Sequence, residues 1–288
     1  MSKDILAKNS ALLKRPSAIA YDQQTAKIIL ADKTGEVHSF PWPLSPSEQE
    51  HYNRINTLSK DPVTRPEDER FMGTFLLGHS SSVVAVSLLS SRLGRFLVTV
   101  DRDEHVRISV FPETYIIHAM GLAHTAFVSA VVSVREGIIS GGGDKRIIQW
   151  DVDGNNKAEY TCENGSCVRW IRKWKDEIVV VCDGYLQILL NFAEQRSSIV
   201  EILQLDGLRP VQKIEMDTPV LDVAFLDDTM YISLDAKQGQ WVKEYTHTGK
   251  EWKIIESSQW EITKREETSV EMYWLEKMRK RIGQGDEE

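Results

Sequence analysis

Short apolar runs of four to eight residues, separated by polar turns, follow each other along most of the chain. Within many runs apolar and polar residues alternate, which is the pattern of a strand with one buried face. The runs are rich in Val, Ile, Phe, Thr and Trp, and the turns in Asp, Gly, Asn and Lys. This regular spacing predicts an all-β fold. The clearest runs lie at 26–32, 95–101, 106–111, 137–142, 146–152, 177–183, 220–225 and 229–235.

Two segments depart from this pattern. Residues 43–70 are polar and contain four prolines, so we expect a long exposed insertion between strand groups. Residues 268–282 have the apolar spacing of one helical face, and a polar, acidic tail follows them. We therefore expect a β domain at 1–267 and a C-terminal helix with its tail at 268–288. The apolar face of that helix consists of Trp274, Leu275, Met278 and Ile282.

Two consecutive segments resemble each other closely. Their first histidines, His79 and His124, are 45 residues apart. Each unit continues with a hydroxyl residue, an aspartate four residues later in a predicted tight turn, and a further residue six positions beyond the aspartate. These positions hold Thr99, Asp103 and Ser109 in the first unit and Ser140, Asp144 and Trp150 in the second.

These repeated residues suit a four-stranded blade whose strands are joined by buried hydrogen bonds. The aspartate accepts a bond from the histidine ring, the hydroxyl bonds the other ring nitrogen, and the tryptophan adds its indole N–H, so every buried polar group is satisfied. The dipeptide Trp150-Asp151 ends a predicted strand, as in a WD repeat. We therefore predict an all-β WD-repeat β-propeller. Its structural network would comprise His79, Thr99, Asp103, His124, Ser140, Asp144 and Trp150, with one donor fewer in the unit that has Ser109.

Three fainter units, at about 16–42, 160–205 and 209–255, bring the count to about five blades. A blade takes roughly 40–45 residues, so the 288 residues, less the insertion and the C-terminal segment, hold five or six. We expect an incomplete or N-terminally shortened version of a seven-bladed ring.

Charge, cysteine content and the lack of targeting signals limit the classes of protein to which the chain can belong. The net charge is −8, whereas a domain that binds nucleic acid by itself usually has a basic excess. The three cysteines form no CxxC pair and predict a reducing compartment. The sequence shows neither a signal peptide nor an apolar stretch long enough to cross a bilayer. We expect the cytosol or nucleus and no membrane partner.

Specific motifs resemble one family. Leu77-Gly78-His79, the run DRDEHVRIS at 101–109 and HTAFVS at 124–129 are similar to the WD-repeat non-catalytic subunit of the eukaryotic tRNA (guanine-N7)-methyltransferase. Residues 14–19 and 31–37 extend the resemblance upstream, and Met272-Tyr273 with 278–280 extends it to the C-terminal segment. The match is dense over 14–152 and sparse afterwards. The DRDEHVRIS run is its most specific part.

The resemblance implies a scaffold without catalytic residues. Such a subunit binds and stabilises a Rossmann-type catalytic subunit in a heterodimer, and the complex methylates a variable-loop guanine of tRNA. S-adenosylmethionine is expected on the catalytic partner, and no cofactor on this chain. We expect the chain in the nucleus, with the cytoplasm as a second location. The motif implies partner contacts at Arg102, Glu104, Arg107, Thr125 and Phe127.

Alternative functions have weaker support. No pair of histidines has metal-ligand spacing, and Lys145 in GGGDK is not followed by Ser or Thr as a phosphate loop requires. The sequence lacks a GxGxxG fingerprint and a GxSxG nucleophile elbow, which argues against an enzyme. A generic WD-repeat scaffold, such as a ubiquitin-ligase substrate receptor or a ribosome-assembly factor, is the main alternative. It would not need the DRDEHVRIS run.

Two basic stretches are candidate tRNA contacts. One interleaves cations with tryptophans at 169–175, and the other lies on the polar side of the predicted C-terminal helix. Alternatively, the cations of the first stretch lie on a solvent-exposed strand face and those of the second on a solvent-exposed helix face. Basic residues near the C-terminus of a helix also stabilise that helix without any partner. The candidate residues are Arg169, Arg172, Lys173, Lys277, Arg279 and Lys280.

Overall fold

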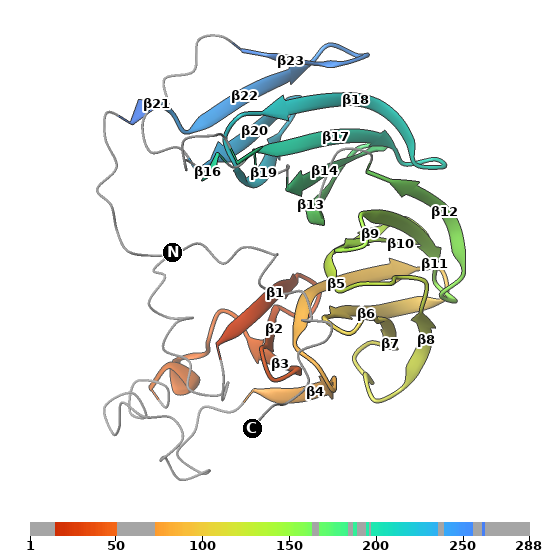
Figure 1. Ribbon diagram of the computed structural model, residues 1–288. Helices are drawn as coiled ribbons and strands as arrows, with labels where there is room; N and C mark the ends of the chain where they lie inside the picture. Colours follow the sequence, from red (N-terminus) through yellow and green to blue (C-terminus); the bar gives the residue numbers. More distant parts are fainter. Residues whose placement is uncertain are drawn as a thin grey trace, which may run out of the picture.

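The computed structural model describes residues 15–50, 73–162, 167–183, 187–188, 194–195, 197–235, 239–255 and 261–262. This part of the chain is almost entirely β structure. Its strands form five four-stranded antiparallel sheets, which follow one another in an arc as the blades of a propeller (Figure 1). The predicted all-β WD-repeat propeller is confirmed, and the described residues contain the five blades that the sequence indicates.

The first three blades each consist of four consecutive strands. Blade 1 contains β1 (Pro16–Asp22), β2 (Lys27–Asp32), β3 (Glu36–Pro41) and β4 (Thr74–Gly78). Blade 2 contains β5 (Val83–Ser91), β6 (Gly94–Asp101), β7 (Val106–Val110) and β8 (Ile117–Gly121). Blade 3 contains β9 (Val128–Val134), β10 (Gly137–Gly142), β11 (Arg146–Asp151) and β12 (Asn156–Thr161).

The last two blades are each accompanied by short additional strands. Blade 4 contains β13 (Cys167–Trp174), β14 (Glu177–Asp183), β17 (Ser198–Gln204) and β18 (Arg209–Met216), with the hairpin β15 (Gln187–Ile188) and β16 (Glu194–Gln195) between β14 and β17. Blade 5 contains β19 (Val220–Leu226), β20 (Thr229–Leu234), β22 (Val242–His247) and β23 (Trp252–Ile254). The pair β21 (Gly239–Gln240) and β24 (Glu261–Ile262) forms a separate small sheet.

Apolar clusters fill the spaces between neighbouring blades. Val98 of β6 and Ile148 of β11 belong to the cluster that joins blades 2 and 3. The adjacent residues Leu97 and Ile147 belong to the clusters on the opposite sides of the same blades. Neighbouring residues of a strand point to opposite faces, so a strand between two blades is buried on both. This explains why central strands contain uninterrupted apolar stretches, such as 96–98 in β6 and 178–182 in β14.

The structure corrects three details of the predicted organisation. The insertion lies inside blade 1, because β3 and β4 pair with each other on either side of it. Residues 209–216 form the fourth strand of blade 4, so they do not open the fifth unit. The unit predicted at about 160–205 also contains the hairpin of β15 and β16, which is separate from the four-stranded sheet of blade 4. Residues 46–50 are helical, and the predicted helix at 268–282 lies outside the described residues.

Candidate partner-binding surface

Because the strands are antiparallel, successive turns alternate between two faces of the arc. We use the term histidine face for the face with residues 79–82, 102–105, 122–127 and 143–145, and opposite face for the one with 135–136, 175–176 and 205–208. The residues for which the sequence predicts partner contacts belong to blades 2 and 3, on or next to the histidine face.

In blade 3 the repeated residues form one chain of hydrogen bonds. The indole N–H of Trp150 donates to Ser140 Oγ at 2.7 Å. Ser140 Oγ lies 2.7 Å from His124 Nε2, and His124 Nδ1 lies 2.8 Å from Asp144 Oδ2. Burial alone would raise the pKa of Asp144, but the hydrogen bond and charge of His124 bring that pKa below its ordinary value. The network holds the turn 143–145 against β10 and β11.

In blade 2 the ring of His79 makes the same two kinds of bond, but with a different aspartate. His79 Nε2 lies 2.7 Å from Thr99 Oγ1, and His79 Nδ1 lies 2.8 Å from Asp101 Oδ2. The prediction of Asp103 as the partner of this ring was therefore wrong. Asp103 instead donates its backbone N–H to Asp101 Oδ1 at 2.8 Å.

The strand register explains why the aspartate that bonds the histidine occupies a different position in blade 2 than in blade 3. Asp101 pairs with Val83, and the residue that pairs with the corresponding Val128 of blade 3 is Gly142. Blade 2 thus has a carboxylate at a position where blade 3 has no side chain. From the end of β6 that carboxylate reaches the ring of His79, and it also lies 3.1 Å from Nδ1 of His105.

Three of the predicted partner contacts are accessible on the histidine face. Arg102 and Glu104 are partly exposed in the turn of blade 2, where Glu104 has a φ of 75°. Thr125 is exposed, and its backbone N–H donates to Asp144 Oδ2 at 3.1 Å. The two networks therefore anchor the backbone beneath these side chains, which leaves a rigid surface for a partner.

The other two predicted contacts serve the fold. Phe127 is 4% exposed and packs with Cys167, so the prediction that its ring forms a surface contact was wrong. Arg107 donates to Ser109 Oγ at 2.9 Å and to the carbonyl oxygens of Gly78 and Thr114 at 3.1 and 3.0 Å. Burial lowers the pKa of Arg107. This guanidinium therefore joins blade 2 to the end of β4.

The basic stretch at 169–175 divides between structure and surface. Arg169 is 7% exposed and forms a bidentate pair with Asp183, with Nε 2.8 Å from Oδ1. Its buried position excludes the predicted tRNA contact. Arg172 is partly exposed and bonds Asp222 of blade 5 at 2.7 Å, while Lys173 is exposed. The candidates Lys277, Arg279 and Lys280 lie outside the described residues.

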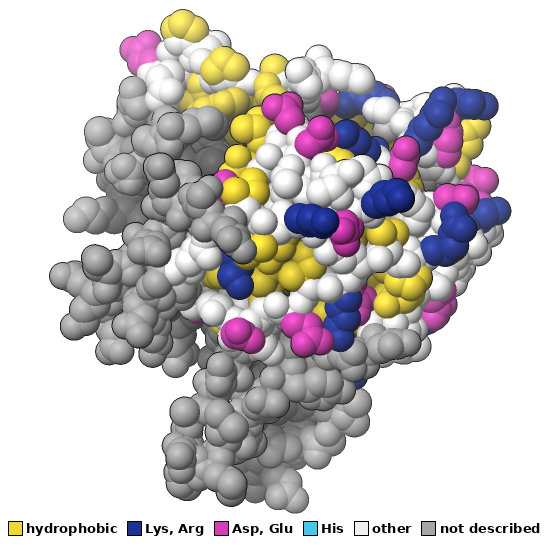
Figure 2. All heavy atoms as spheres, turned by 90° about the horizontal axis from the view of Figure 1, so that it is seen from above, with side chains coloured by type: hydrophobic (Ala, Val, Ile, Leu, Met, Phe, Trp, Pro, Cys, Tyr) yellow, Lys and Arg dark blue, Asp and Glu magenta, His cyan; other side chains and the backbone are white. Residues whose placement is uncertain are grey.

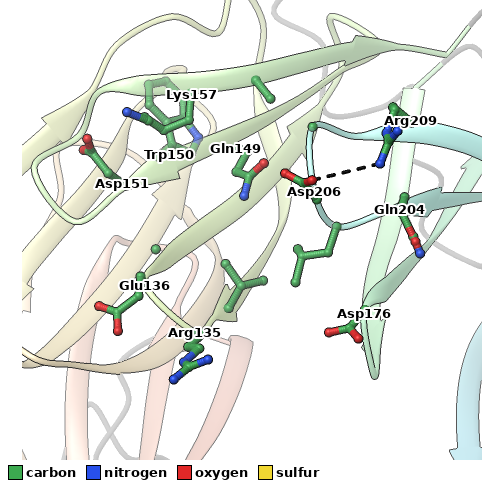
Figure 3. A pocket seen from close by; sticks show the side chains of 15 residues that line it. Arg135, Glu136, Gln149, Trp150, Asp151, Lys157, Asp176, Gln204, Asp206 and Arg209 are labelled. Carbon is green, nitrogen blue, oxygen red and sulfur yellow. Dashed lines mark ion pairs between the residues drawn. The ribbon is translucent and has the colours of Figure 1, made fainter.

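A pocket of about 940 Å³ lies on the opposite face between blades 3 and 4 (Figure 3). Charged side chains from both blades surround it, and Asp206 and Arg209 form an ion pair at 4.0 Å at its edge. Its lining is mainly charged and polar, so the pocket offers ionic contacts to a binding partner. The lining residues are Val134, Arg135, Glu136, Gly137, Gln149, Trp150, Asp151, Lys157, Ala158, Asp176, Gln204, Leu205, Asp206, Gly207 and Arg209.

The face of the molecule seen in Figure 2 has a mixed charge. Figure 2 shows lysines and arginines interspersed with acidic side chains and apolar patches. The described residues contain no group of three or more His, Cys, Asp or Glu side chains that could hold a metal ion, and none of their helices is long and apolar enough to cross a membrane.

Sequence reasoning overlooked two residues with structural roles. Asp101 is the acceptor for His79, and Asp183 is the buried partner of Arg169. Each aspartate ends a central apolar strand, β6 or β14. An acidic residue directly after a strand that is buried on both faces must find a donor nearby, and this signal was available in the sequence.

Five sheets joined by interblade cores, together with the His124–Ser140–Trp150 network, define a WD-repeat β-propeller. Solved structures with this fold are similar along most of the chain. The WD40 β-propeller domain of Doa1 has a TM-score of 0.57 at 12% identity and covers 85% of this chain and 70% of that chain. A chain in the crystal structure of the Mitotic Checkpoint Complex has a TM-score of 0.58 at 11% identity, with coverages of 84% and 64%. At such low identity the similarity shows the fold alone.

Comparison of the sequence with known families shows to which family the chain belongs. The family model described as the tRNA methyltransferase TRM82 WD40 domain matches residues 49–256, and the chain belongs to this family. A relative from Saccharomyces cerevisiae (strain RM11-1a) is 33% identical over 154 residues, which cover 52% of this chain and 30% of the relative. One from Aspergillus oryzae is 30% identical over 271 residues, with coverages of 77% and 53%. Both are named tRNA (guanine-N(7)-)-methyltransferase non-catalytic subunit. The chain spans about a third to a half of their length.

Proposed function

We propose that this chain is the non-catalytic WD-repeat subunit of a tRNA (guanine-N7)-methyltransferase. In this role it binds and stabilises a Rossmann-type catalytic subunit as a heterodimer, which holds S-adenosylmethionine and methylates a guanine in the variable loop of tRNA. The observation that carries the proposal is the match of the TRM82 WD40 family model over 49–256. The relatives named as non-catalytic subunits support it. We place this complex in the nucleus.

The histidine face offers a surface for such a partner. Arg102 and Glu104 present opposite charges in one turn, and exposed Thr125 lies on the same face in the neighbouring blade. Their backbone is held by the networks of His79 and His124. A rigid surface loses little conformational entropy when a partner binds. Exposed charges at such a surface also steer association and select the partner.

The proposal is tested by co-expression with the catalytic methyltransferase subunit of the same organism. The two chains should co-purify, and the complex should methylate tRNA with S-adenosylmethionine as donor, while this chain alone should not. Methyl transfer by the purified chain alone would contradict the non-catalytic role. If the two folded chains remain separate at micromolar concentration, the heterodimer is wrong.

A charge reversal tests the proposed surface. The variant Arg102→Glu should weaken the complex at least about tenfold, because a lost ion pair is replaced by repulsion. Arg135→Glu, on the opposite face, is the matched control and should bind as the wild type does. Equal affinities of Arg102→Glu and the wild type, with unchanged thermal unfolding, would place the interface elsewhere while leaving the assembly itself intact.

A further inference from the structure

All three cysteines of the chain lie near the junction of blades 3 and 4. Cys162 follows β12, Cys167 begins β13 and Cys182 lies near the end of β14. All three side chains are buried and at most 1% exposed. The sulfur atoms of Cys162 and Cys182 lie only 3.0 Å apart. Two thiols at this distance are close to bonding geometry.

The strand register separates Cys167 from this pair. Across β13 and β14, Cys167 pairs with Asp183 and Val168 pairs with Cys182. Neighbouring residues on a strand point to opposite faces, so Cys167 and Cys182 lie on opposite faces of blade 4. Cys182 shares an apolar cluster with Cys162, whereas Cys167 packs with Phe127 and its Sγ lies 3.7 Å from Asp183 Oδ2. One pair of thiols is thus placed to react.

We infer that Cys162 and Cys182 are a site of reversible disulfide formation by a peroxide, which joins the outer end of blade 3 to the second strand of blade 4. An S–S bond measures about 2.0 Å. The two sulfurs therefore have to approach by about 1 Å, which small rotations of two side chains achieve. The backbone of both blades can stay in place.

The chemistry balances with hydrogen peroxide as the oxidant. The thiolate of Cys162 attacks one peroxide oxygen, the O–O bond breaks, and the products are a sulfenic acid and hydroxide, which takes up a proton to become water. The thiol of Cys182 then attacks the sulfenic sulfur, the S–S bond forms, and a second water leaves. Two thiols are oxidised by two electrons, and one peroxide is reduced. An added thiol reductant reverses the reaction by exchange.

The fold gives the two cysteines different roles. The hydrogen bond to Cys162 and burial hold the pKa of Cys182 well above its ordinary value, so Cys182 is a poor first nucleophile. Cys162 follows β12, an edge strand whose pairing partner among the described strands is β11 and which has an exposed or half-exposed residue at every position. Edge strands of this kind open locally at low cost. Peroxide therefore reaches Cys162 first when β12 opens, and Cys182 resolves the sulfenic acid.

The bond would make blades 3 and 4 harder to separate. It closes a loop of about 20 residues, which lowers the entropy of the unfolded chain. We expect the oxidised protein to unfold roughly 5–10 °C above the reduced one. Oxidation would in this way lock two neighbouring blades together, and reduction would release them.

The test uses the full chain, fully reduced and then treated with hydrogen peroxide at neutral pH. The free thiols, counted after denaturation, should fall from three to one, and the intact mass should fall by about 2 Da. Peptide mapping without reductant should identify the Cys162–Cys182 linkage in the wild type. A reductant should restore three thiols and the lower unfolding temperature.

Three variants separate the pair from the remaining cysteine. Cys167→Ser should still form the bond and show the stability gain, whereas Cys162→Ala and Cys182→Ala should show neither. Because mapping of the wild type already identifies the linkage, the test holds even if Cys182→Ala folds poorly. A linkage that includes Cys167, a sulfenic or sulfinic acid without a crosslink, or three unreacted thiols would each overturn the inference.

Discussion

His79 Nδ1 lies 2.8 Å from Asp101 Oδ2, and this bond connects the first residue of a repeat unit to the end of its second strand. Because Asp101 is 1% exposed, its removal leaves a buried ring nitrogen and two backbone N–H groups without their acceptor. Asp101→Ala should therefore lower the free energy of unfolding by about 2–4 kcal/mol. Asp103→Ala is the matched control in the same turn and should cost less than about 1 kcal/mol. Urea unfolding of both variants decides between the two aspartates, and a larger loss for Asp103 would contradict the assignment.

The buried pair of Arg169 and Asp183 leads to a second prediction. Arg169→Met leaves the Asp183 carboxylate buried without its guanidinium, so we expect a loss of about 3–5 kcal/mol. Arg172→Met, on the same strand, removes a half-exposed pair with Asp222 and should cost less than about 1 kcal/mol. Thermal unfolding monitored by circular dichroism measures both. If the two variants are equally stable, Arg169 has no special structural role.

A third prediction concerns the glycine run at the end of β10. A Cβ atom at Gly142 would overlap the backbone carbonyl oxygen of Phe127, which cannot move without breaking the pairing of β9 and β10. Gly142→Ala should therefore destabilise the protein by about 2–3 kcal/mol or prevent folding. At Gly78 the nearest atom to an added Cβ is 3.7 Å away, so Gly78→Ala should change stability by less than about 0.5 kcal/mol. Soluble yield and chemical unfolding test this pair of variants, and equal stability would show that the close approach at Gly142 is relaxed in solution.

A fourth prediction is that acid lowers the stability that the hydrogen-bond networks of His79 and His124 give to the fold. Hydrogen bonds from His79 and His124 overcome the effect of burial and hold the pKa values of Asp101 and Asp144 below their ordinary value of about 3.9. The unfolded chain therefore takes up protons more readily than the folded one. This contribution to stability is complete above about pH 4 and is lost as the pH falls through the folded-state pKa values. Thermal unfolding between pH 6 and pH 2.5 measures it. The variant Asp144→Asn should lose less stability over this range than the wild type, and an unchanged slope would contradict the prediction.

The fold could be predicted because a strand that is buried on both faces shows as a short apolar stretch in the sequence. Residues 96–98 and 178–182 are continuously apolar, and they form the middle of β6 and of β14. The boundaries between the blades were harder to predict from the sequence. The fourth strand of blade 4, at 209–216, is largely exposed and follows the third through a short turn, so nothing local assigns it to one blade or the next.

The candidate site could be predicted only where backbone geometry determines it. Arg102, Glu104 and Thr125 are accessible because they belong to turns, which strand patterns locate well. Phe127 is the last residue of the turn 122–127, and Arg169 is the third residue of β13. Whether their side chains face solvent or the neighbouring blade depends on the packing of two sheets. Asp101 ends β6 and Asp103 lies two residues later in the following turn, and only the register of β5 and β6 decides which of them reaches His79.

The position of the insertion within blade 1 has a practical consequence. Ser39 and Thr74 are register partners, so β3 and β4 hold the two sides of the insertion together through their own pairing. A protease cut within 51–72 would therefore leave two polypeptides that remain associated through the sheet. The same position is suited to the insertion of a fluorescent reporter, since this would not change the strand order of the blade.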